Sequence, residues 1–357
     1  MFSKYRHLFE KLFKNLRAKG IAGGLDISDF AIRFAHFDGQ RWQLKSQRLA
    51  PGVVERGRVR DYARFREGLT ALHRDILGES VAKRKISSVV SMSSMAVYSQ
   101  VFALPMVTGE NLEKAISLNL QIVSPAESSQ SYSGWQIIGK DKTLLNLEIF
   151  SAFINRPAVD EINRALKEAG FIAVVVEMKA LALSRLLRER GSGFDPNKSY
   201  LVMGFDSSGL DSLVVRRGQL YFEYFNYWSD IFQSEDREVA FSVFESAVVK
   251  NMNQVLNFYN QHWPDDRIAE VFIVAGNMEK EAAKIIKDNF ALPTRSFELN
   301  LAQPTSSAWY VALGGGLRAL KRRDENTEVN FLGAEAREEF YRHHVITFIK
   351  FWQVAVP

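Results

Sequence analysis

Apolar and polar residues alternate near the start of the chain in the way that a half-buried β-strand requires. The alternation runs from Ala31 to Phe37, and Asp38-Gly39 follows it as a hairpin turn. We therefore expect residues 21–50 to form three strands joined by two turns. From residue 61 to residue 77 the apolar positions recur at helical spacing instead, which predicts the first helix of the body.

Strand and helix patterns then alternate as far as residue 191. Strands are predicted at 85–105 (two, joined by a serine-rich turn), 144–154 and 171–178, and a loop running into a further strand at 124–138. Helices are predicted at 109–123, 156–170 and 179–191. Residues 191–199 read GSGFDPNKS, which is typical of a linker because its glycine and proline positions interrupt any apolar period.

The pattern of the opening recurs after this linker. Residues 199–225 again predict strand, turn, strand, glycine turn and strand, and a long helix follows at about 238–262. A buried strand at 270–277, a helix at 279–289, a turn at Pro293 and a helix at 309–321 complete the pattern. Two halves that each begin with a meander of strands predict an α/β protein with two duplicated lobes, and a cleft between such lobes is a natural ligand site.

The first twenty residues have a different character. Their apolar side chains share one helical face, and Lys and Arg supply nearly all of the charge. A basic amphipathic helix of this kind lies either on an anionic membrane surface or on the body of its own protein, and the pattern leaves both interpretations open.

Composition narrows the classes of function. The chain has 357 residues, 46% of them hydrophobic and 24% charged, with a net charge of +5 and no cysteine. Its length predicts two lobes, and the missing cysteines exclude disulfides, thiolate catalysis and cysteine-bound zinc. No apolar run reaches the roughly 20 residues that span a bilayer, and the opening lacks a signal-peptide pattern, so we expect a cytoplasmic chain. The basic run at Lys321 lacks the interleaved aromatic residues of a nucleic-acid site, so no nucleic acid is expected.

Several segments, taken in order, resemble the PilM family, the actin-like assembly proteins of the type IV pilus. They are GLDIS followed by Arg33, VVSMSSMAVYSQVFALP, AGFIAVVVEMKALALSRLL, VFIVAGN and YVALGGGLRAL. The resemblance covers nearly the whole chain and extends to the cytoplasmic domain of GspL from type II secretion. It implies a bilobal actin-like ATPase fold of two ribonuclease-H-like lobes at 21–190 and 198–320, with a small inserted subdomain at about 105–150.

The end of the chain carries a second resemblance. Val329, Asn330, Phe331 and Leu332 are similar to the short peptide that begins PilN-type partners and that binds a groove on the PilM body. A charged stretch and an apolar run follow, although Gly333 stands where the peptide usually has proline. The resemblance implies that residues 321–357 comprise a linker, a PilN-like peptide and the start of a membrane-directed helix. The alternative is that the final apolar run is the last helix of the globular core.

The resemblance also implies a nucleotide cleft for ATP and Mg. Its residues here are Asp26 and Ser28 in the first turn, Asp206, Ser207 and Ser208 in the second, and Gly276 under the adenosine. Gly314 lies in the last predicted helix, where a small residue permits either close packing or the approach of a nucleotide. The family has glycine where Ser28 stands, and its aspartate falls on Gly204 of the second turn. These departures lead us to expect a cleft that keeps its shape but hydrolyses no ATP. The alternative is that Asp26 and Asp206 only bond the backbone of their own turns.

Other catalytic patterns are absent from the sequence. The six histidines show no metal-ligand spacing with acids, and the serines at 91, 93 and 94 have no base in a recognisable pattern. We therefore expect no enzyme and no metal site, but a scaffold at the inner membrane whose partners are PilN- and PilO-type proteins and the membrane surface. The competing hypotheses are an ATPase or kinase-clan enzyme with a degraded site, and a membrane-surface sensor acting through residues 1–20.

Overall fold

A computed structural model gives the arrangement of most of the chain. The structure describes residues 21–78, 84–125, 127, 129–141, 144–206, 208–231, 241–276, 278–321 and 325–332. The helix predicted at residues 1–20 and the membrane-directed segment predicted after Leu332 lie outside these described residues. No helix of the described part is long and apolar enough to cross a membrane.

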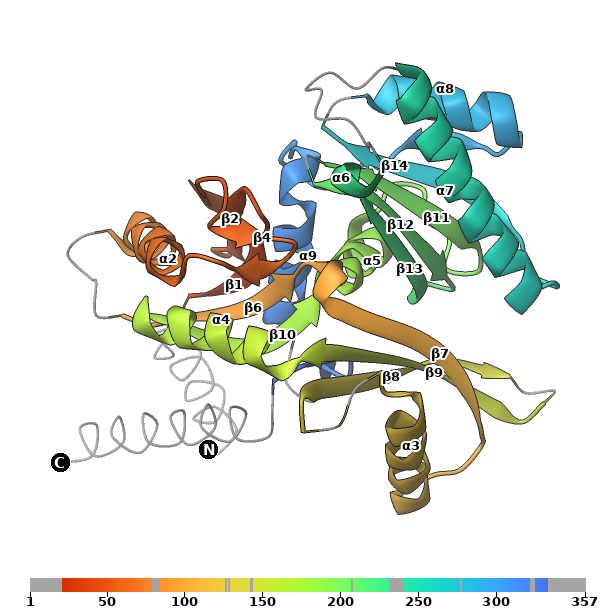
Figure 1. The fold of residues 1–357 in the computed structure, drawn as a ribbon, viewed down its shortest axis with the longest axis horizontal. Helices are drawn as coiled ribbons and strands as arrows, with labels where there is room; N and C mark the ends of the chain where they lie inside the picture. Colours follow the sequence, from red (N-terminus) through yellow and green to blue (C-terminus); the bar gives the residue numbers. More distant parts are fainter. Residues whose placement is uncertain are drawn as a thin grey trace, which may run out of the picture.

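The first lobe is built on a five-stranded sheet with the order β10-β6-β1-β2-β3 (Figure 1). Its strands are β1 (Ala22–Ile27), β2 (Ala31–Phe37), β3 (Trp42–Arg48), β6 (Ile86–Met92) and β10 (Phe171–Met178). β1, β2 and β3 form the predicted antiparallel meander, while β6 runs parallel to β1 and β10 parallel to β6. This order leaves β10 at one edge of the sheet. A two-stranded hairpin, β4 (Val54–Glu55) with β5 (Arg58–Val59), follows the meander.

Two helices pack together beside this sheet, α2 (Tyr62–Leu77) and α4 (Arg156–Glu168). α2 begins at the N-cap Asp61, whose side chain accepts a hydrogen bond from the Arg64 N–H at 3.0 Å. α4 begins at Asn155, which caps the Ala158 N–H in the same way, and Pro157 fits its first turn. Both helices lie close to the positions that the sequence predicts.

The second lobe repeats the plan of the first. Its five-stranded sheet has the order β13-β12-β11-β14-β15, from β11 (Ser199–Phe205), β12 (Gly209–Arg216), β13 (Gln219–Tyr227), β14 (Ile268–Ala275) and β15 (Thr294–Ser296). The short α6 (Trp228–Ile231) follows β13, and α7 (Phe241–His262) and α8 (Glu279–Phe290) pack beside the sheet. Each lobe thus places an antiparallel meander beside two parallel strands, which is the ribonuclease-H-like arrangement.

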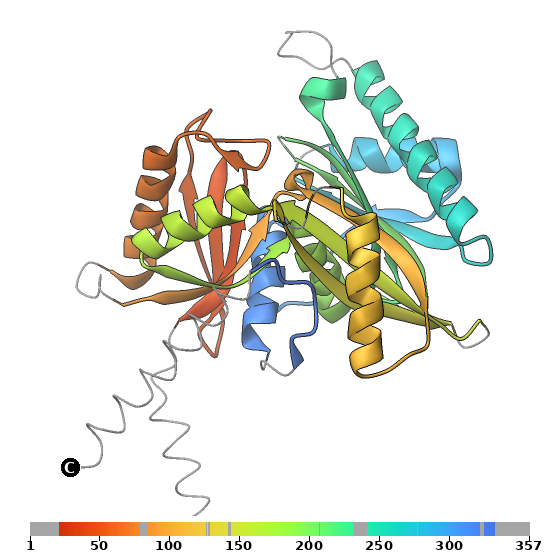
Figure 2. The same cartoon turned by 60° about the horizontal axis from the view of Figure 1, so that its bottom comes forward.

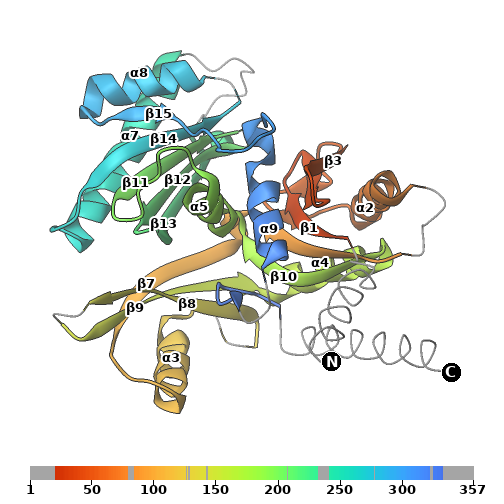
Figure 3. The ribbon, with the colours of Figure 1, turned by 180° about the vertical axis from the view of Figure 1, so that it is seen from behind.

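Two helices each pack against the sheet of the other lobe rather than the sheet that precedes them in the sequence. α5 (Lys179–Arg190) follows the first sheet in sequence but packs on β12 and β13, whereas α9 (Tyr310–Leu320) follows the second sheet but packs on β1 (Figures 1 and 3). The sequence boundaries had assigned α9 to the second lobe. Its position has a steric reason: a Cβ on Gly24 of β1 would lie 2.3 Å from the Gly316 N atom of α9, so only glycine permits this approach. α5 and α9 also pack on each other and tie the lobes together.

A small sheet with the order β7-β9-β8 is inserted into the first lobe. It comprises β7 (Val97–Pro105), β8 (Ser131–Asp141) and β9 (Asn146–Asn155), and α3 (Glu110–Val123) packs on it (Figure 2). A separate small core of Leu104, Ile116, Leu147 and Ile149 holds α3 in place. The insertion therefore runs from 97 to 155, somewhat longer than the predicted 105–150. The 3-10 turns η2 (Ser94–Ala96) and η3 (Ser307–Trp309) precede β7 and α9.

Candidate functional site

The first predicted phosphate turn joins β1 to β2. Asp26 is buried near the end of β1, and its carboxylate lies 3.4 Å from the Arg33 guanidinium. The Ser28 hydroxyl donates a hydrogen bond to the Ala31 carbonyl at 2.9 Å and accepts one from the Ala31 N–H at 3.2 Å. Both side chains are thus engaged by their own hairpin. Burial raises the pKa of Asp26 to about 6, with a smaller contribution from Asp206, although Arg33 and Lys179 act in the opposite direction.

The second predicted turn joins β11 to β12, and its polar side chain also bonds to the backbone of its own turn. The Asp206 carboxylate accepts hydrogen bonds from the Ser208 N–H at 2.7 Å and the Gly209 N–H at 3.1 Å. In addition, the Trp228 indole N–H donates to the Asp206 carbonyl at 2.7 Å. This is an Asx turn, in which a side chain takes the backbone donors that a phosphate would need.

Lys179, at the start of α5, is the cation between the two turns. Its ammonium lies 3.3 Å from the Asp211 carboxylate and 4.5 Å from the centre of the Phe225 ring. Burial alone would lower its pKa, but the charges of Asp211, Asp206 and Glu223 raise it above the usual range. Burial also raises the pKa of Asp211 and of Glu223, which share one face of β12 and β13. Lys179 therefore neutralises a group of carboxyls of the second lobe, and its charge also lowers the pKa of Asp26 in the first lobe.

The remaining predicted nucleotide residues are more widely distributed. Gly276 follows β14 and is exposed, with open space where a Cβ would lie, and Ser207 lies outside the described residues. Gly314 is buried in α9, where a Cβ would lie 2.1 Å from the Ala182 carbonyl oxygen of α5. The structure thus brings Asp26 and Asp206 close enough for their charges to interact, but places Gly314 in the contact between two helices.

These residues do not fit a magnesium-bound triphosphate. The Ser208 and Gly209 N–H groups already serve Asp206, and Ser28 already serves Ala31. An incoming phosphate would also meet the carboxyls gathered around Lys179, which would repel it. Among the residues that the structure describes, no group of three or more His, Asp or Glu side chains is placed to hold a metal ion.

The second candidate site is where Val329–Leu332 lies against the body. The Phe331 N–H donates to the Val176 carbonyl at 2.8 Å, and the Val176 N–H donates to the Asn330 side-chain oxygen at 3.1 Å. Val176 lies on β10, the edge strand of the first sheet. An edge strand exposes unpaired backbone groups, and here the tail segment satisfies both groups of one residue. The segment thus bonds to the open edge of β10 through one backbone and one side-chain hydrogen bond, without forming a strand itself (Figure 3).

Apolar burial supplies the second part of this contact. Val329, Phe331 and Leu332 are 1%, 0% and 3% exposed, and they belong to the main core of the body. Burying side chains of this size stabilises by about 1.5–3 kcal/mol each. On the opposite side of the segment, a Cβ on Gly134 of β8 would lie 2.7 Å from the Val329 Cγ1 methyl. Glycine at this position therefore lets the inserted sheet close over the segment. We call the space between β8, β10 and α9 the tail groove.

Buried charges form the floor of the tail groove. Glu177 of β10 is fully buried and forms a bidentate pair with Arg185 of α5, at 3.0 and 2.6 Å. Arg318 of α9 also pairs with Glu177, and it donates to the carbonyls of Val329 at 2.8 Å and Glu328 at 2.7 Å. The Arg318 guanidinium therefore holds the segment by its backbone.

Glu328 completes this network from the tail side. Its carboxylate accepts hydrogen bonds from Arg185 Nε at 2.7 Å and Arg188 Nη2 at 2.8 Å, and Arg185 Nη2 makes a further close contact with it. Burial would raise the pKa of Glu328, but the charges of Arg185, Arg318 and Arg188 lower it well below its usual range. Glu328 is therefore ionised at neutral pH and anchors the segment.

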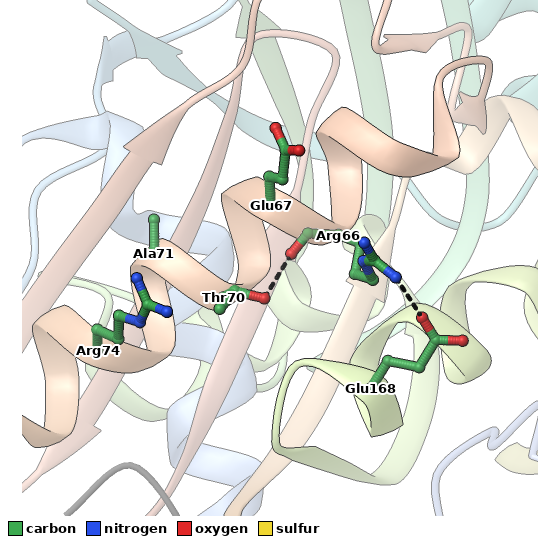
Figure 4. A pocket seen from close by; sticks show the side chains of 6 residues that line it. All are labelled: Arg66, Glu67, Thr70, Ala71, Arg74 and Glu168. Atoms are coloured by element: carbon green, nitrogen blue, oxygen red, sulfur yellow. Dashed lines mark hydrogen bonds and ion pairs between the residues drawn. The ribbon is translucent and has the colours of Figure 1, made fainter. Parts of the chain in front are cut away.

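A shallow surface depression lies between α2 and α4, away from both candidate sites. Its lining residues are Arg66, Glu67, Thr70, Ala71, Arg74 and Glu168 (Figure 4). Arg66 pairs with Glu168 at 3.4 Å, and both side chains are largely exposed to solvent. Such a pair contributes little and does not define a binding site.

Comparison with known proteins addresses the fold. No protein-family model matches the chain, and no curated protein matches its sequence. Among solved structures, a PilM-PilN type IV pilus biogenesis complex is similar, with 18% identity and a TM-score of 0.64, over 84% of this chain and 99% of that one. The chain has an actin-like fold. This confirms the fold class predicted from the sequence, and the likeness to PilM holds at the level of that fold.

Two weaker likenesses complete the comparison. The cytoplasmic domain of EpsL, an inner membrane component of the type II secretion system of Vibrio cholerae, is 9% identical with a TM-score of 0.46, over 88% of this chain and 98% of that one. A Bacteroides thetaiotaomicron protein with an actin-like ATPase fold is 11% identical with a TM-score of 0.43, over 78% and 91%. The actin-like fold rests on the likeness to the PilM-PilN structure and on the strand orders of the two five-stranded sheets.

Sequence reasoning missed the residues that receive the tail. Glu177 lies in an apolar strand, and a carboxylate in such a strand needs a buried partner. This signal could have identified Glu177 as a paired residue, but no spacing could have identified Arg318 as its partner or Gly134 as a contact of Val329. The role of Lys179 could not be predicted for the same reason, because the carboxylates that surround it belong to other elements.

Proposed function

We propose that this actin-like protein is a scaffold of a type IV pilus or type II secretion assembly platform at the inner membrane. Its body docks a PilN-type cytoplasmic peptide, and its own residues 329–332 take the place of that peptide. What supports this most is the burial of the segment along the edge of β10, with its backbone bonded to Val176 and Arg318.

Tethering makes such docking efficient. A peptide that is joined to its receptor by a short connection has an effective concentration of about millimolar, so even a weak groove is filled. Only the few residues between Leu320, which ends α9, and Glu328 separate the segment from the body. The PilM-PilN complex carries the name of a two-protein assembly, and in this chain we propose that one polypeptide supplies both parts.

The scaffold is proposed not to be an enzyme. The donors and carboxyls of the two turns are committed to Arg33, Lys179 and the turns themselves, which argues against a working ATPase or kinase site. ATP with Mg is therefore not part of the proposal.

A cytoplasmic location at the inner membrane, with PilN- and PilO-type partners, remains part of the proposal. The membrane contact predicted for residues 1–20 is also kept as a proposal. It would be recognised by salt-sensitive binding to anionic liposomes that is lost when residues 1–19 are deleted.

The test is a double substitution in the tail segment, Phe331→Ala with Leu332→Ala. Removing two buried side chains costs about 2–5 kcal/mol each when their sites stay empty. We expect the segment to leave the tail groove while the two lobes remain folded. Hydrogen exchange should therefore accelerate at the Val329 and residue-331 amides, and protease should cut the chain close to the segment. The body should still melt in one cooperative transition.

The matched control is Leu320→Ala, because Leu320 lies at the end of α9 and is 53% exposed. This variant should leave the exchange and the protease pattern unchanged. If the double substitution unfolds the body together with the tail, the segment is an ordinary part of the core and the docking proposal fails.

A further inference from the structure

The tail groove contains more positive than negative charge when the contribution of the tail is subtracted. Arg185 and Arg318 are 0% and 1% exposed, and both pair with Glu177. Glu177 is thus the one carboxylate of the body that these two guanidiniums share among the described residues. Arg188 adds a third guanidinium at the rim of the groove, where it is partly exposed and pairs with Glu189 of α5 at 3.3 Å. The Lys321 ammonium, which lies 2.7 Å from the same Glu189 carboxylate, adds a fourth cation, so four cations face two carboxylates of the body. The second carboxylate that Arg185 contacts comes from Glu328, which belongs to the tail and also pairs with Arg188.

A buried cation that lacks a partner is costly, so the groove needs this second carboxylate from whatever fills it. We propose that the tail groove is an acid-selective peptide site, which requires a carboxylate two residues before the asparagine of its occupant. The inference rests on the proposed function, since it specifies the chemistry of the peptide that the groove docks.

The position of the carboxylate is fixed by the backbone on its C-terminal side. The Val329 N–H donates to the Gln136 side-chain oxygen at 3.0 Å, and the Asn330 side chain is held by Val176. With these two residues in register, residue 328 points toward α5 and reaches Arg185 and Arg188. The structure therefore assigns a pattern to the occupant: an acidic residue, an apolar residue, asparagine, and two large apolar residues.

Charge, rather than size, should decide recognition at this position. Arg185 and Arg188 offer only donors at this position, and a carboxylate can accept from both residues at once. A glutamine keeps the length of the side chain but offers one oxygen together with a donor amide, which would face a guanidinium. A lysine would add a further cation beside Arg185, Arg188 and Lys321.

The experiment uses the full chain with Phe331→Ala and Leu332→Ala as the receptor, because its groove is vacated by its own segment. The ligand is an acetylated synthetic peptide with the sequence of residues 325–332, compared with peptides that carry glutamine or lysine in place of Glu328. Binding is measured by fluorescence anisotropy at two salt concentrations. The glutamine peptide should bind about 30-fold more weakly than the native peptide, and the lysine peptide more weakly still.

A second receptor that also carries Arg188→Gln separates charge recognition from a loss of packing. There the preference for the acidic peptide over the glutamine peptide should shrink, because one of its donors is gone. Equal binding of the acidic and glutamine peptides would overturn the acid-selective site but leave the docking proposal intact. Failure of all three peptides to bind a folded receptor would overturn both.

A variant of the otherwise natural chain keeps the inference testable if the double variant does not fold. In Glu328→Gln, the Phe331 amide should exchange about 30-fold faster than in the natural chain. Exchange at the natural rate would overturn the acid-selective site. Glu67→Gln, on the exposed face of α2, is the control and should change nothing at Phe331.

Discussion

Gly134→Ala tests the geometry of the tail groove with a single methyl group. Gly134 is not among the glycines with positive φ, so alanine can adopt its backbone conformation without strain. A Cβ at this position would nevertheless lie 2.7 Å from Val329 Cγ1 and 3.2 Å from the Asn330 N atom. The substitution therefore disturbs the tail segment and leaves β8 itself intact.

The expected magnitude follows from these distances. Carbon atoms in contact are about 3.5–4.0 Å apart, so the segment must move by roughly 1 Å. Such a shift weakens the bonds of Val329 to Gln136 and Arg318, and overpacking of this kind costs about 1–3 kcal/mol. If that cost is confined to docking, the fraction of chains with the segment released rises about 5–150-fold.

Hydrogen exchange at single amides measures this fraction. The Val329 and Phe331 amides should exchange faster by about that factor, while amides in the sheet of the second lobe should keep their rates. Gly276→Ala is the matched control because a Cβ there meets open space. If the Phe331 amide exchanges at the same rate in Gly134→Ala as in the natural chain, the close packing of β8 on the segment is refuted.

Two further predictions concern the inter-lobe cleft. The pKa of Asp26 is about 6 in the folded protein against 3.8 ordinarily, so the folded state binds the proton more tightly and its stability falls as pH rises from about 4 to 6. Between pH 4 and pH 7, chemical denaturation should therefore show Asp26→Asn gaining up to about 3 kcal/mol of stability relative to the natural chain. A difference in stability that does not change with pH would contradict the assigned pKa. Mg-ATP at millimolar concentration should leave the melting temperature unchanged, whereas stabilisation that grows with ligand concentration would show that the cleft binds nucleotide.

The sequence predicted the two lobes well because each begins with a local pattern. A meander of three strands depends on alternation and hairpin turns between neighbours, as in Ala31–Phe37 followed by Asp38-Gly39. The exchange of α5 and α9 between the lobes could not be predicted in this way. It depends on contacts such as Gly24 with Gly316, which are far apart in the sequence and become neighbours only in the folded chain.

In the candidate sites, too, local sequence patterns were predictable and contacts between distant residues were not. The sequence singled out the tail peptide, because four consecutive residues carry its pattern. It did not reveal the receptor, whose residues Gly134, Glu177, Arg185 and Arg318 come from four separate elements. The two predicted turns join β1 to β2 and β11 to β12, but their chemistry depends on the partners that folding brings to them, above all Lys179.

The central claim is that the chain fills its own peptide groove, and one binding measurement tests it most directly. A labelled peptide with the sequence of residues 325–332 is titrated into the full natural chain and, separately, into the variant with Phe331→Ala and Leu332→Ala. The account predicts saturable binding to the variant and little binding to the natural chain, whose groove is already occupied. Equal binding to the two proteins, or binding to neither while both are folded, would contradict it.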